Sequence, residues 1–450
     1  MLNSISQEKI TEKKVTVMWQ SLLAAGCDLQ SVSGQPLKII YSGKNSDVPG
    51  SDFQEAVVAA DNRTIRGNIE IHVKSSDWYN HGHHRNPEYN DVVLHVVMWH
   101  DCQFDIRLQN GEVIPTIPID RYLDDISRMP VLNSLPCSGI GVHAGEKLLE
   151  VLEAGGKARF CNKESRFENN LKYQEPGQCL YGGIMGALGY ANNTESFRKL
   201  AEKVPLSVLE SVPESENPDG TSSIWRQALL LGNAGFIPMQ VTENDSSQVE
   251  DYPYINNLKD IWRNGGYSNV MSLSDWQVFR VRPSNSPLRR LVGMSCLIQR
   301  YQEKGLLKGL IELVQEVSPE KSYAQLQAGL VVADDGYWRD HFAFFKQCRK
   351  LSKWVVGPSK ADNIIVNVLL PFTYAWSKNR GQKELSEKAC ALFCSYPALE
   401  TNTIERHMKV QFSLKNSQVN SALRQQGLLH LYRNYCTQGR CVECNVINNV

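Results

Sequence analysis

Residues 67–74 read GNIEIHVK, and this alternation of apolar and ionisable side chains is typical of a β-strand. Because successive side chains of a strand point to opposite faces, Glu70, His72 and Lys74 share one face. Three ionisable groups in register are costly to bury unless they meet a metal, a substrate or solvent. The stretch therefore predicts a sheet with one apolar face and one face available for chemistry.

Further strand patterns lie on both sides of this stretch. They cover residues 37–41, 53–60 and 92–99, with a hairpin expected over 104–119. Residues 8–25 place apolar side chains on one helical face, and Gly26 is suited to end that helix. A single sheet with one helix against it is the economical prediction for residues 1–125.

The rest of the chain has a different pattern. A linker rich in Pro, Ser and Gly covers residues 126–142, and beyond it the apolar residues recur with the helical period. The predicted helices include 288–301, 306–317 and 341–354. The fold class is therefore α+β, with an N-terminal mixed α/β sheet domain, a larger all-α domain over 143–435 and a short Cys-rich tail over 436–450.

Composition narrows the class of protein. The 450 residues contain 48 basic and 48 acidic side chains, so overall charge indicates no partner. No basic and apolar leader opens the chain, and the longest apolar run, 364–376, is too short to cross a membrane. We therefore expect a cytoplasmic protein with no membrane contact, in which the 12 cysteines are metal ligands or free thiols rather than disulfides.

Six of the ten histidines fall between residues 72 and 100. Imidazoles and carboxylates together are what metal sites and acid/base sites are made of. His81 is far enough from the end of the strand to fold back over Glu70, whereas His83 and His84 are each expected to be solvated loop residues. His95 lies in an apolar strand, where a core histidine with one hydrogen bond is the common outcome.

Two acidic residues resemble a nuclease site. Asp52 precedes Glu70 by one strand and one turn, so a hairpin could bring the carboxylates together. An Asp on one strand and Glu-x-Lys on the next resemble the PD-(D/E)xK restriction-endonuclease-like nucleases, whose core is a helix, three strands, a helix and a strand. The resemblance implies that Asp52 and Glu70 bind Mg²⁺ or Mn²⁺. It also implies that His72, which replaces the family's Lys, or Lys74 activates water with help from His81.

The order of motifs resembles a bacterial family that is catalogued only as a domain of unknown function, number 2851. The matching motifs are Gly43, Asn45, 50–53, 67–72, 75–78, His81, His83, 89–90, 94–97, Asp101, 279–283, 367–371 and the Cys-rich tail. This resemblance spans nearly the whole chain and brings no established reaction. Relatives tend to carry Gly-Pro-Asp-Phe where this chain has Gly-Ser-Asp-Phe at residues 50–53. Pro is also common in the nucleases at the position that corresponds to Ser51.

A basic segment lies in the predicted helical domain. Residues 279–310 contain seven Lys or Arg against a single acid, and they begin with Arg280, Arg282, Arg289 and Arg290. Guanidinium forks suit phosphate oxygens, so these arginines are the predicted nucleic-acid contact. An ordinary solvated helix face is the alternative.

The tail carries a chelating pattern. Cys436, Cys441 and Cys444 form C-x4-C-x2-C, which suits Zn²⁺ or an iron–sulfur cluster. A zinc site and an iron–sulfur cluster each need four protein ligands, and the tail supplies three, so the fourth ligand must come from another part of the chain. The candidates for the fourth ligand are Cys390, Cys394, Cys348 and His430. Some nucleases of the type named above hold their ends together with a cysteine-bound iron–sulfur cluster, which the resemblance would extend to this tail.

The leading interpretation is a metal-dependent nuclease that hydrolyses phosphodiester bonds of nucleic acid. One alternative is a noncatalytic module that binds nucleic acid or protein and holds a structural metal. Another is a zinc-dependent hydrolase of a small molecule, with His72, His81, His83 and Asp101 at its centre. The nuclease requires Asp52 and Glu70 to share a cation, whereas the zinc enzyme requires three converging imidazoles.

Overall fold

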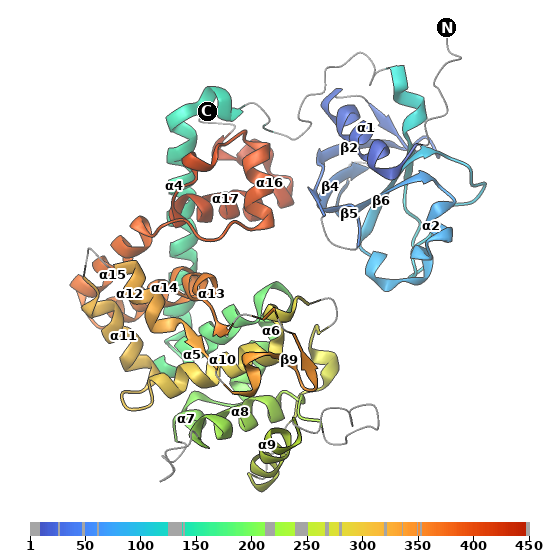
Figure 1. The fold of residues 1–450 in the computed structure, drawn as a ribbon. Helices are drawn as coiled ribbons and strands as arrows, with labels where there is room; N and C mark the ends of the chain where they lie inside the picture. Colours follow the sequence, from blue (N-terminus) through green and yellow to red (C-terminus); the bar gives the residue numbers. More distant parts are fainter. Residues whose placement is uncertain are drawn as a thin grey trace. The chain divides into compact units, whose positions relative to one another are not determined.

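The computed structural model shows an α+β protein, and the predicted order of an N-terminal sheet followed by a larger helical region is confirmed (Figure 1). The residues that it describes are 10–25, 28–46, 50–60, 63–124, 137, 140–211, 221–238, 251–265, 270–278, 281–318, 322–334, 336–348, 350–351 and 353–446. The chain forms two compact units. Unit 1 comprises Met1–Gly156, Thr401–Asn420 and Arg424–Val450, and unit 2 comprises Lys157–Glu400 and Ser421–Leu423.

Unit 1 is built on one mixed sheet. Its main elements are α1 (Glu12–Ala25), β1 (Leu29–Gln30), β2 (Pro36–Tyr41), β3 (Lys44–Asn45), β4 (Phe53–Ala60), β5 (Arg63–Lys74), α2 (Asp77–Asn80), β6 (Val92–Trp99), β7 (Thr116–Pro118), the start of α4 (Ile140–Asn170), α16 (Thr403–Gln411) and most of α17 (Ala422–Asn434). The strand order is β1-β2-β4-β5-β6-β7, with β3 added to β4. Strands β1 to β5 pair antiparallel, whereas β5, β6 and β7 pair parallel.

Helix α1 covers one face of this sheet (Figure 1). Its Val15 and Trp19 are fully buried and belong to the same apolar cluster as Ile69, Ile71 and Leu94. The Glu70 and His72 side chains alternate with these isoleucines, so β5 turns them away from α1. The predicted division of β5 into an apolar and an ionisable face therefore holds.

Part of the opposite face is covered by the C-terminal helices. Tyr41 of β2 and Val57 of β4 are buried with Met408 of α16 and Leu431 of α17. The Tyr432 hydroxyl donates a hydrogen bond to the Glu55 carboxylate. Residues 401–420 and 424–435 were predicted to belong to the helical domain, but they join unit 1 because the sheet needs an apolar cover on this side.

Gly67 sets the distance between β5 and β6. A Cβ atom at this position would lie 2.3 Å from both the Asp91 carbonyl oxygen and Val93 Cγ1, which no ordinary side chain tolerates. The absence of a side chain lets the Asn68 amide donate to the Asp91 carbonyl at 2.7 Å. Gly67, the first residue of the stretch 67–74, therefore allows β6 to pair parallel with β5.

Unit 2 is mostly helical. Besides the end of α4, it contains α5 (Pro176–Leu188), α6 (Tyr190–Lys203), α7 (Leu206–Glu210), α8 (Thr221–Asn233), α9 (Tyr252–Asn264), α10 (Pro287–Arg300), α11 (Leu306–Glu316), α12 (Ser322–Leu330), α13 (Pro358–Ile364), a π-helical turn (Ile365–Leu369), α14 (Leu370–Asn379) and α15 (Lys383–Ser395). One large apolar cluster joins these helices. In the described part of the chain, no helix has both the length and the apolar character needed to span a bilayer.

Two predicted elements were wrong. Residues 341–354, predicted as a helix, form the short strands β9 (His341–Ala343) and β10 (Lys346–Gln347), and β11 (Trp354–Val356) pairs with β8 (Val332–Ala333). The hairpin predicted over 104–119 is reduced to one bridge between Arg107 and Val113. The reason is that residues 116–118 form β7, which pairs parallel with β6 instead of completing the hairpin.

Candidate metal centre

The face of β5 opposite α1 carries Glu70 and His72. Their side chains are deeply buried, with 5% and 1% of the residue surface exposed. In the parallel pairing of β5 with β6, Glu70 lies opposite His95, which has no exposed surface. Since His95 faces away from the α1 cluster, the two strands place one carboxylate and two imidazoles side by side.

The segment that follows β5 folds back over this face. Trp78 of α2 is fully buried, and its indole Nε1 donates to the Arg107 carbonyl at 2.9 Å. Gly82 adopts a φ of 77°, a left-handed conformation that glycine allows, and leads into the short helical turn His83–Arg85. As a result His83 is buried and His81 remains exposed, and both rings contact His72.

Two aspartates hold the ends of this segment. Asp101 accepts hydrogen bonds from Ser75 Oγ at 3.0 Å and from the Ser76 amide and hydroxyl, both at 2.9 Å. Asp77 Oδ2 accepts from the Lys74 amide at 3.0 Å. Asp101, a candidate ligand from the sequence, therefore contacts serines rather than imidazoles and acts as an anchor of the loop.

Three imidazole nitrogens converge in front of β5. His72 Nε2 lies 3.1 Å from His81 Nδ1 and 3.2 Å from His83 Nε2. All three ligand atoms lie within 4.8 Å of one another. In a tetrahedral site with Zn–N distances of about 2.0–2.1 Å, ligand nitrogens are about 3.3 Å apart. The spacing of the trio is therefore close to what one metal ion requires.

His95 orients the central imidazole. His72 Nδ1 and His95 Nε2 are hydrogen-bonded at 2.9 Å. When the proton lies on His72 Nδ1, the Nε2 lone pair of the same ring is free to face the other two imidazoles. His95 then carries its own proton on Nδ1, a buried atom with no partner among the described residues. A second histidine that fixes the tautomer of a ligating histidine is a common support of metal sites.

Glu70 joins the histidines to a second carboxylate. Its Oε1 lies 3.4 Å from His83 Nε2 and 3.8 Å from His72 Nε2. Its Oε2 accepts a hydrogen bond from the Asp52 amide at 3.2 Å, and Asp52 Oδ2 accepts from the Ile71 amide at 2.8 Å. These reciprocal bonds hold the acidic pair on neighbouring strands.

Burial controls the charges in this site. It lowers the pKa of His72 to about 2, of His95 to about 3 and of His83 to about 4, and the neighbouring imidazoles add to the effect. Burial, followed by the charge of Asp52, raises the pKa of Glu70 to about 9. His72, His83 and His95 are therefore neutral near neutral pH, with lone pairs available, and no Lys or Arg in the described residues forms an ion pair with Glu70 or Asp52.

Of the residues singled out from the sequence, the structure brings Asp52, Glu70, His72 and His81 together. Lys74 stands apart, because it is exposed at the end of β5 opposite Trp99. The expectation for His83 was wrong, since it is buried within the trio rather than solvated. Gly82 was the signal for its position, because a glycine between two histidines marks a turn that can return the chain.

Two of the four arginines predicted to contact phosphate, Arg289 and Arg290, are buried. Arg289 is 2% exposed and donates to the carbonyls of Trp338, His341 and Trp354. Arg290 is 5% exposed and donates to the Leu188 carbonyl and the Asn285 side chain. Both are therefore structural braces within unit 2. Arg282 is exposed, and Arg280 lies outside the described residues.

The tail cysteines Cys436, Cys441 and Cys444 lie in unit 1. Three of the proposed fourth ligands, Cys348, Cys390 and Cys394, belong to unit 2. The remaining candidate, His430, is hydrogen-bonded through Nδ1 to the Asn434 amide at 2.9 Å. A cysteine that the sequence reasoning passed over, Cys137, lies near the tail thiols instead.

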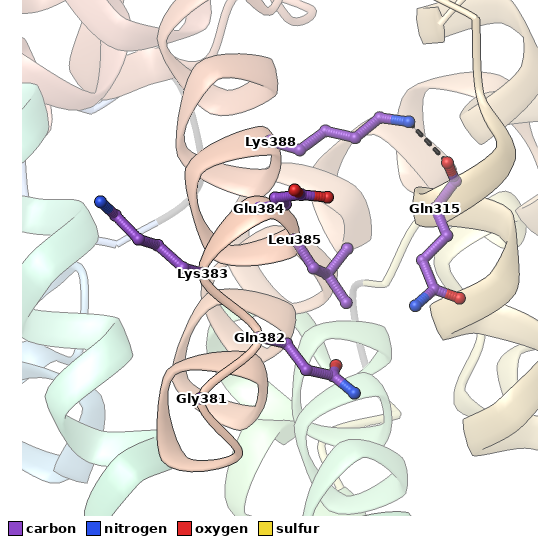
Figure 2. Close-up of a pocket in the computed structure, with 7 residues that line it drawn as sticks. All are labelled: Gln315, Gly381, Gln382, Lys383, Glu384, Leu385 and Lys388. Atoms are coloured by element: carbon purple, nitrogen blue, oxygen red, sulfur yellow. Dashed lines mark hydrogen bonds between the residues drawn. The ribbon is translucent and has the colours of Figure 1, made fainter.

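Unit 2 contains a separate pocket of about 710 Å³. Its lining consists of Gln315, Gly381, Gln382, Lys383, Glu384, Leu385 and Lys388 (Figure 2). Lys388 Nζ donates to the Gln315 and Val317 carbonyls at 2.6 and 3.0 Å, so it caps the C-terminal end of α11. With no histidine or cysteine in its lining, this pocket lacks the ligand types of the β5 site.

Fold and site together define an α+β protein whose sheet carries three converging imidazoles beside an acidic pair. The chain belongs to the family described as Protein of unknown function (DUF2851), which it matches over residues 12–403. This match includes every residue of the histidine cluster and most of unit 2. Comparison with curated proteins and with solved structures finds no match.

Proposed function

We propose that the protein is a metal-dependent hydrolase whose centre lies on the β5 and β6 face of unit 1. The supporting observation is the convergence of ligand nitrogens from His72, His81 and His83 within 4.8 Å. Three neutral imidazoles with an open fourth position are a typical ligand set of a catalytic zinc ion. Among the described residues, no other group of three such ligand atoms is this compact.

In this proposal each surrounding residue has a distinct part. A metal ion held by the trio would supply Lewis acidity and a water of lowered pKa. A metal ion held by the trio would lower the raised pKa of Glu70, whose Oε1 lies near the ligating nitrogens, so that the carboxylate could accept the proton of the attacking water as general base. The Asp52 amide holds the other oxygen of Glu70, and His95 keeps His72 in the ligating tautomer. His81 is exposed, so the substrate would approach from its side.

We assign phosphodiester bonds of nucleic acid as the substrate class. The support is the order of α1, the three longer antiparallel strands β2, β4 and β5, α2 and the parallel strand β6, with the acidic pair at the start of β4 and on β5, which resembles the nucleases named above. Asp52 itself precedes the first residue of β4. The charge of Glu12, at the start of α1, also acts on both Asp52 and Glu70.

The acidic pair supports a second position for the cation. Carboxylate oxygens suit Mg²⁺ or Mn²⁺ better than imidazole does. In this variant Asp52 and Glu70 would bind the ion, and His72, two residues beyond Glu70, would activate water. Both positions of the cation lead to the same hydrolysis. They differ in which metals restore activity and in how activity responds to the replacement of Asp52.

The experiment uses metal-free full-length protein with labelled DNA, labelled RNA, bis(4-nitrophenyl) phosphate and 4-nitrophenyl acetate. Zn²⁺, Mn²⁺ or Mg²⁺ is added back in separate reactions. We expect cleavage of phosphodiesters with an added metal and its loss in His72→Ala. His84→Gln is the matched control, because His84 is an imidazole of the same loop that lies outside the trio.

The variant Asp52→Asn separates the two cation positions. Zn²⁺-supported cleavage that survives this change places the metal on the histidines, whereas loss of Mg²⁺-supported or Mn²⁺-supported cleavage places it on the acidic pair. Cleavage of the acetate ester alone would replace the nuclease by a small-molecule hydrolase. Nucleic-acid binding without any cleavage would contradict the hydrolase and leave the noncatalytic module.

A further inference from the structure

Four cysteines of unit 1 lie near one another, and two of them contact the buried Gln411 side chain. Cys436 and Cys444 belong to the apolar cluster formed with α16 and α17, and Cys137 packs against that cluster. Gln411 Nε2 of α16 donates to Cys436 Sγ at 3.8 Å, and the Gln411 side chain is also hydrogen-bonded to the Cys137 thiol. Cys441 lies half-buried between the two other cysteines of the tail. A residue far upstream thus meets the closing C-x4-C-x2-C pattern.

The four thiols act on one another electrostatically. Burial raises the pKa of Cys137 to about 12, and the charges of Cys444 and Cys441 contribute next. Burial also raises the pKa of Cys436, followed by the charges of Cys444, Cys137 and Cys441. Since such repulsion falls off with distance, the four sulfurs share one environment. Thiol groups that share one environment in this way can be bound together by one metal centre.

The backbone of the tail packs against the sheet. Gly439 has a φ of 67° and separates the short turns Cys436–Gln438 and Cys441–Glu443. A Cβ at Gly439 would lie 3.0 Å from Val57 Cγ1 of β4, so the turn packs directly on the sheet. The Arg66 guanidinium also donates to the Gln438 carbonyl at 3.2 Å. These contacts fix the tail independently of the thiols.

The spacing of the sulfurs discriminates between two kinds of centre. None of these four cysteines is in a disulfide. With Zn–S distances of about 2.3 Å, the sulfurs of a tetrahedral zinc site would lie about 3.8 Å apart. The histidine trio is the one group in the described residues whose ligand atoms all lie within 4.8 Å, so no three of these thiols are that close. An iron–sulfur cluster spaces its thiolates more widely, because each binds a different iron atom.

We propose that Cys137, Cys436, Cys441 and Cys444 hold an iron–sulfur cluster, with Cys137 as the fourth ligand. Cluster binding displaces the thiol protons and neutralises the thiolates with iron. The cluster ties Cys137 to the tail that packs on β4, which gives it a structural role. This inference is independent of the histidine site, since it stands whether or not that site is catalytic.

The test is anaerobic purification of the full chain, with measurement of iron, acid-labile sulfide, zinc and visible absorption. We expect iron and sulfide in equal amounts and a broad visible absorption that bleaches on exposure to air. Cys137→Ala should lose most of the iron and of this absorption. Cys390→Ala is the matched control, because it removes a half-buried thiol of unit 2 and should keep both.

Folding of the variants is checked separately by far-ultraviolet circular dichroism, and Cys137→Ser serves as a smaller change at the same position. A protein that binds zinc and no iron would overturn the cluster. Wild-type protein without bound metal, or a Cys137→Ala protein that keeps the full iron content, would overturn the assignment of the ligands.

Discussion

The histidine cluster on β5 and the arginines of α10 look alike in the sequence, because each gathers ionisable side chains in a short stretch. The structure separates them. Arg289 donates hydrogen bonds to three backbone carbonyls, and Arg290 donates to one backbone carbonyl and to the side-chain oxygen of Asn285. The ring nitrogens of His72, His81 and His83 instead face one another, and beside them Glu70 has no Lys or Arg as ion-pair partner in the described part of the chain.

The arginines of α10 and the histidines on β5 differ in which atoms their hydrogen-bonding groups contact, rather than in charge. A buried polar group whose partners are all internal contributes to the fold, because removing it leaves those partners unpaired. Several imidazoles whose ring nitrogens converge on one another are instead typical of a metal site. The count of Lys and Arg that pointed to α10 therefore includes two structural arginines, Arg289 and Arg290, whereas the count of imidazoles pointed to the place where we propose chemistry.

The largest effect is expected for Glu70→Gln. If Glu70 is the general base of the hydrolysis, the amide cannot accept the proton, and turnover should fall by about 10²–10⁴-fold. Steady-state cleavage of a labelled nucleic acid measures this. Metal content should change little, since the three imidazoles remain. A variant with unchanged turnover would remove Glu70 from the reaction and weaken the contrast with α10.

The next effect tests the structural role of the arginines. Arg289→Met leaves the carbonyls of Trp338, His341 and Trp354 without donors, so the free energy of unfolding should drop by about 3 kcal/mol. Urea unfolding monitored by tryptophan fluorescence checks this. The exposed Arg282→Met is the control and should stay within about 0.5 kcal/mol of the parent. Equal losses in both variants would contradict the distinction.

A third effect concerns a histidine whose partner is present. Burial, with the charge of Lys44, lowers the pKa of His407 to about 4, and Tyr41 hydrogen-bonds to its Nε2. The unfolded chain takes up this proton near pH 6.5, so the stability contribution is complete above that pH and is lost as pH falls towards 4. The full change is about 3 kcal/mol.

Unfolding of His407→Gln at several pH values measures this contribution. The variant should lose less stability than the parent between pH 6.5 and 4, because glutamine does not titrate. Identical pH dependence in the two proteins would show that His407 protonates equally well in the folded state, against its burial beside Tyr41.

A smaller effect is expected from the residue behind the trio. His95→Leu removes the acceptor for the His72 Nδ1 proton, so metal affinity should fall by about 10–100-fold. Isothermal titration with Zn²⁺ measures the change, and His95→Gln should restore part of the affinity because its amide oxygen can accept. Equal affinity in the parent and His95→Leu would show that the histidine pair does not orient a ligand.

The smallest effect concerns nucleic-acid binding. Among the four arginines predicted to contact phosphate, Arg282 is the exposed one in the described residues. Arg282→Ala should weaken nucleic-acid binding modestly and lower the slope of log affinity against log salt by about 1. Fluorescence anisotropy at several salt concentrations checks this. An unchanged slope would take Arg282 out of the interface.

Much of the fold could be predicted from periodicity. The ends of β4 and β6 were predicted correctly, since turn-forming residues bound both runs. Residues 341–354 were not, because the sequence gives no sign of the positive φ of 59° at Phe345, which turns β9 into β10. That hairpin is braced by Arg289, a tertiary contact that a local pattern does not encode.

The site was predictable in part for the same reason. Strand alternation placed Glu70 and His72 on one face, because that inference needs only the period of a strand. The position of the His83 side chain beside His72 depends on the loop that Trp78 anchors. The proximity of Cys137 to the tail cysteines depends on the packing of the apolar cluster that they share in unit 1. Both require tertiary structure, so neither could be read from residue spacing.

The most direct measurement is anomalous diffraction at the zinc absorption edge from crystals soaked in Zn²⁺. The account predicts a peak within coordination distance of His72 Nε2, His81 Nδ1 and His83 Nε2, and no such peak in crystals of His72→Ala. Crystals that diffract well, take up zinc elsewhere and show no density among these three nitrogens would contradict a metal centre on β5.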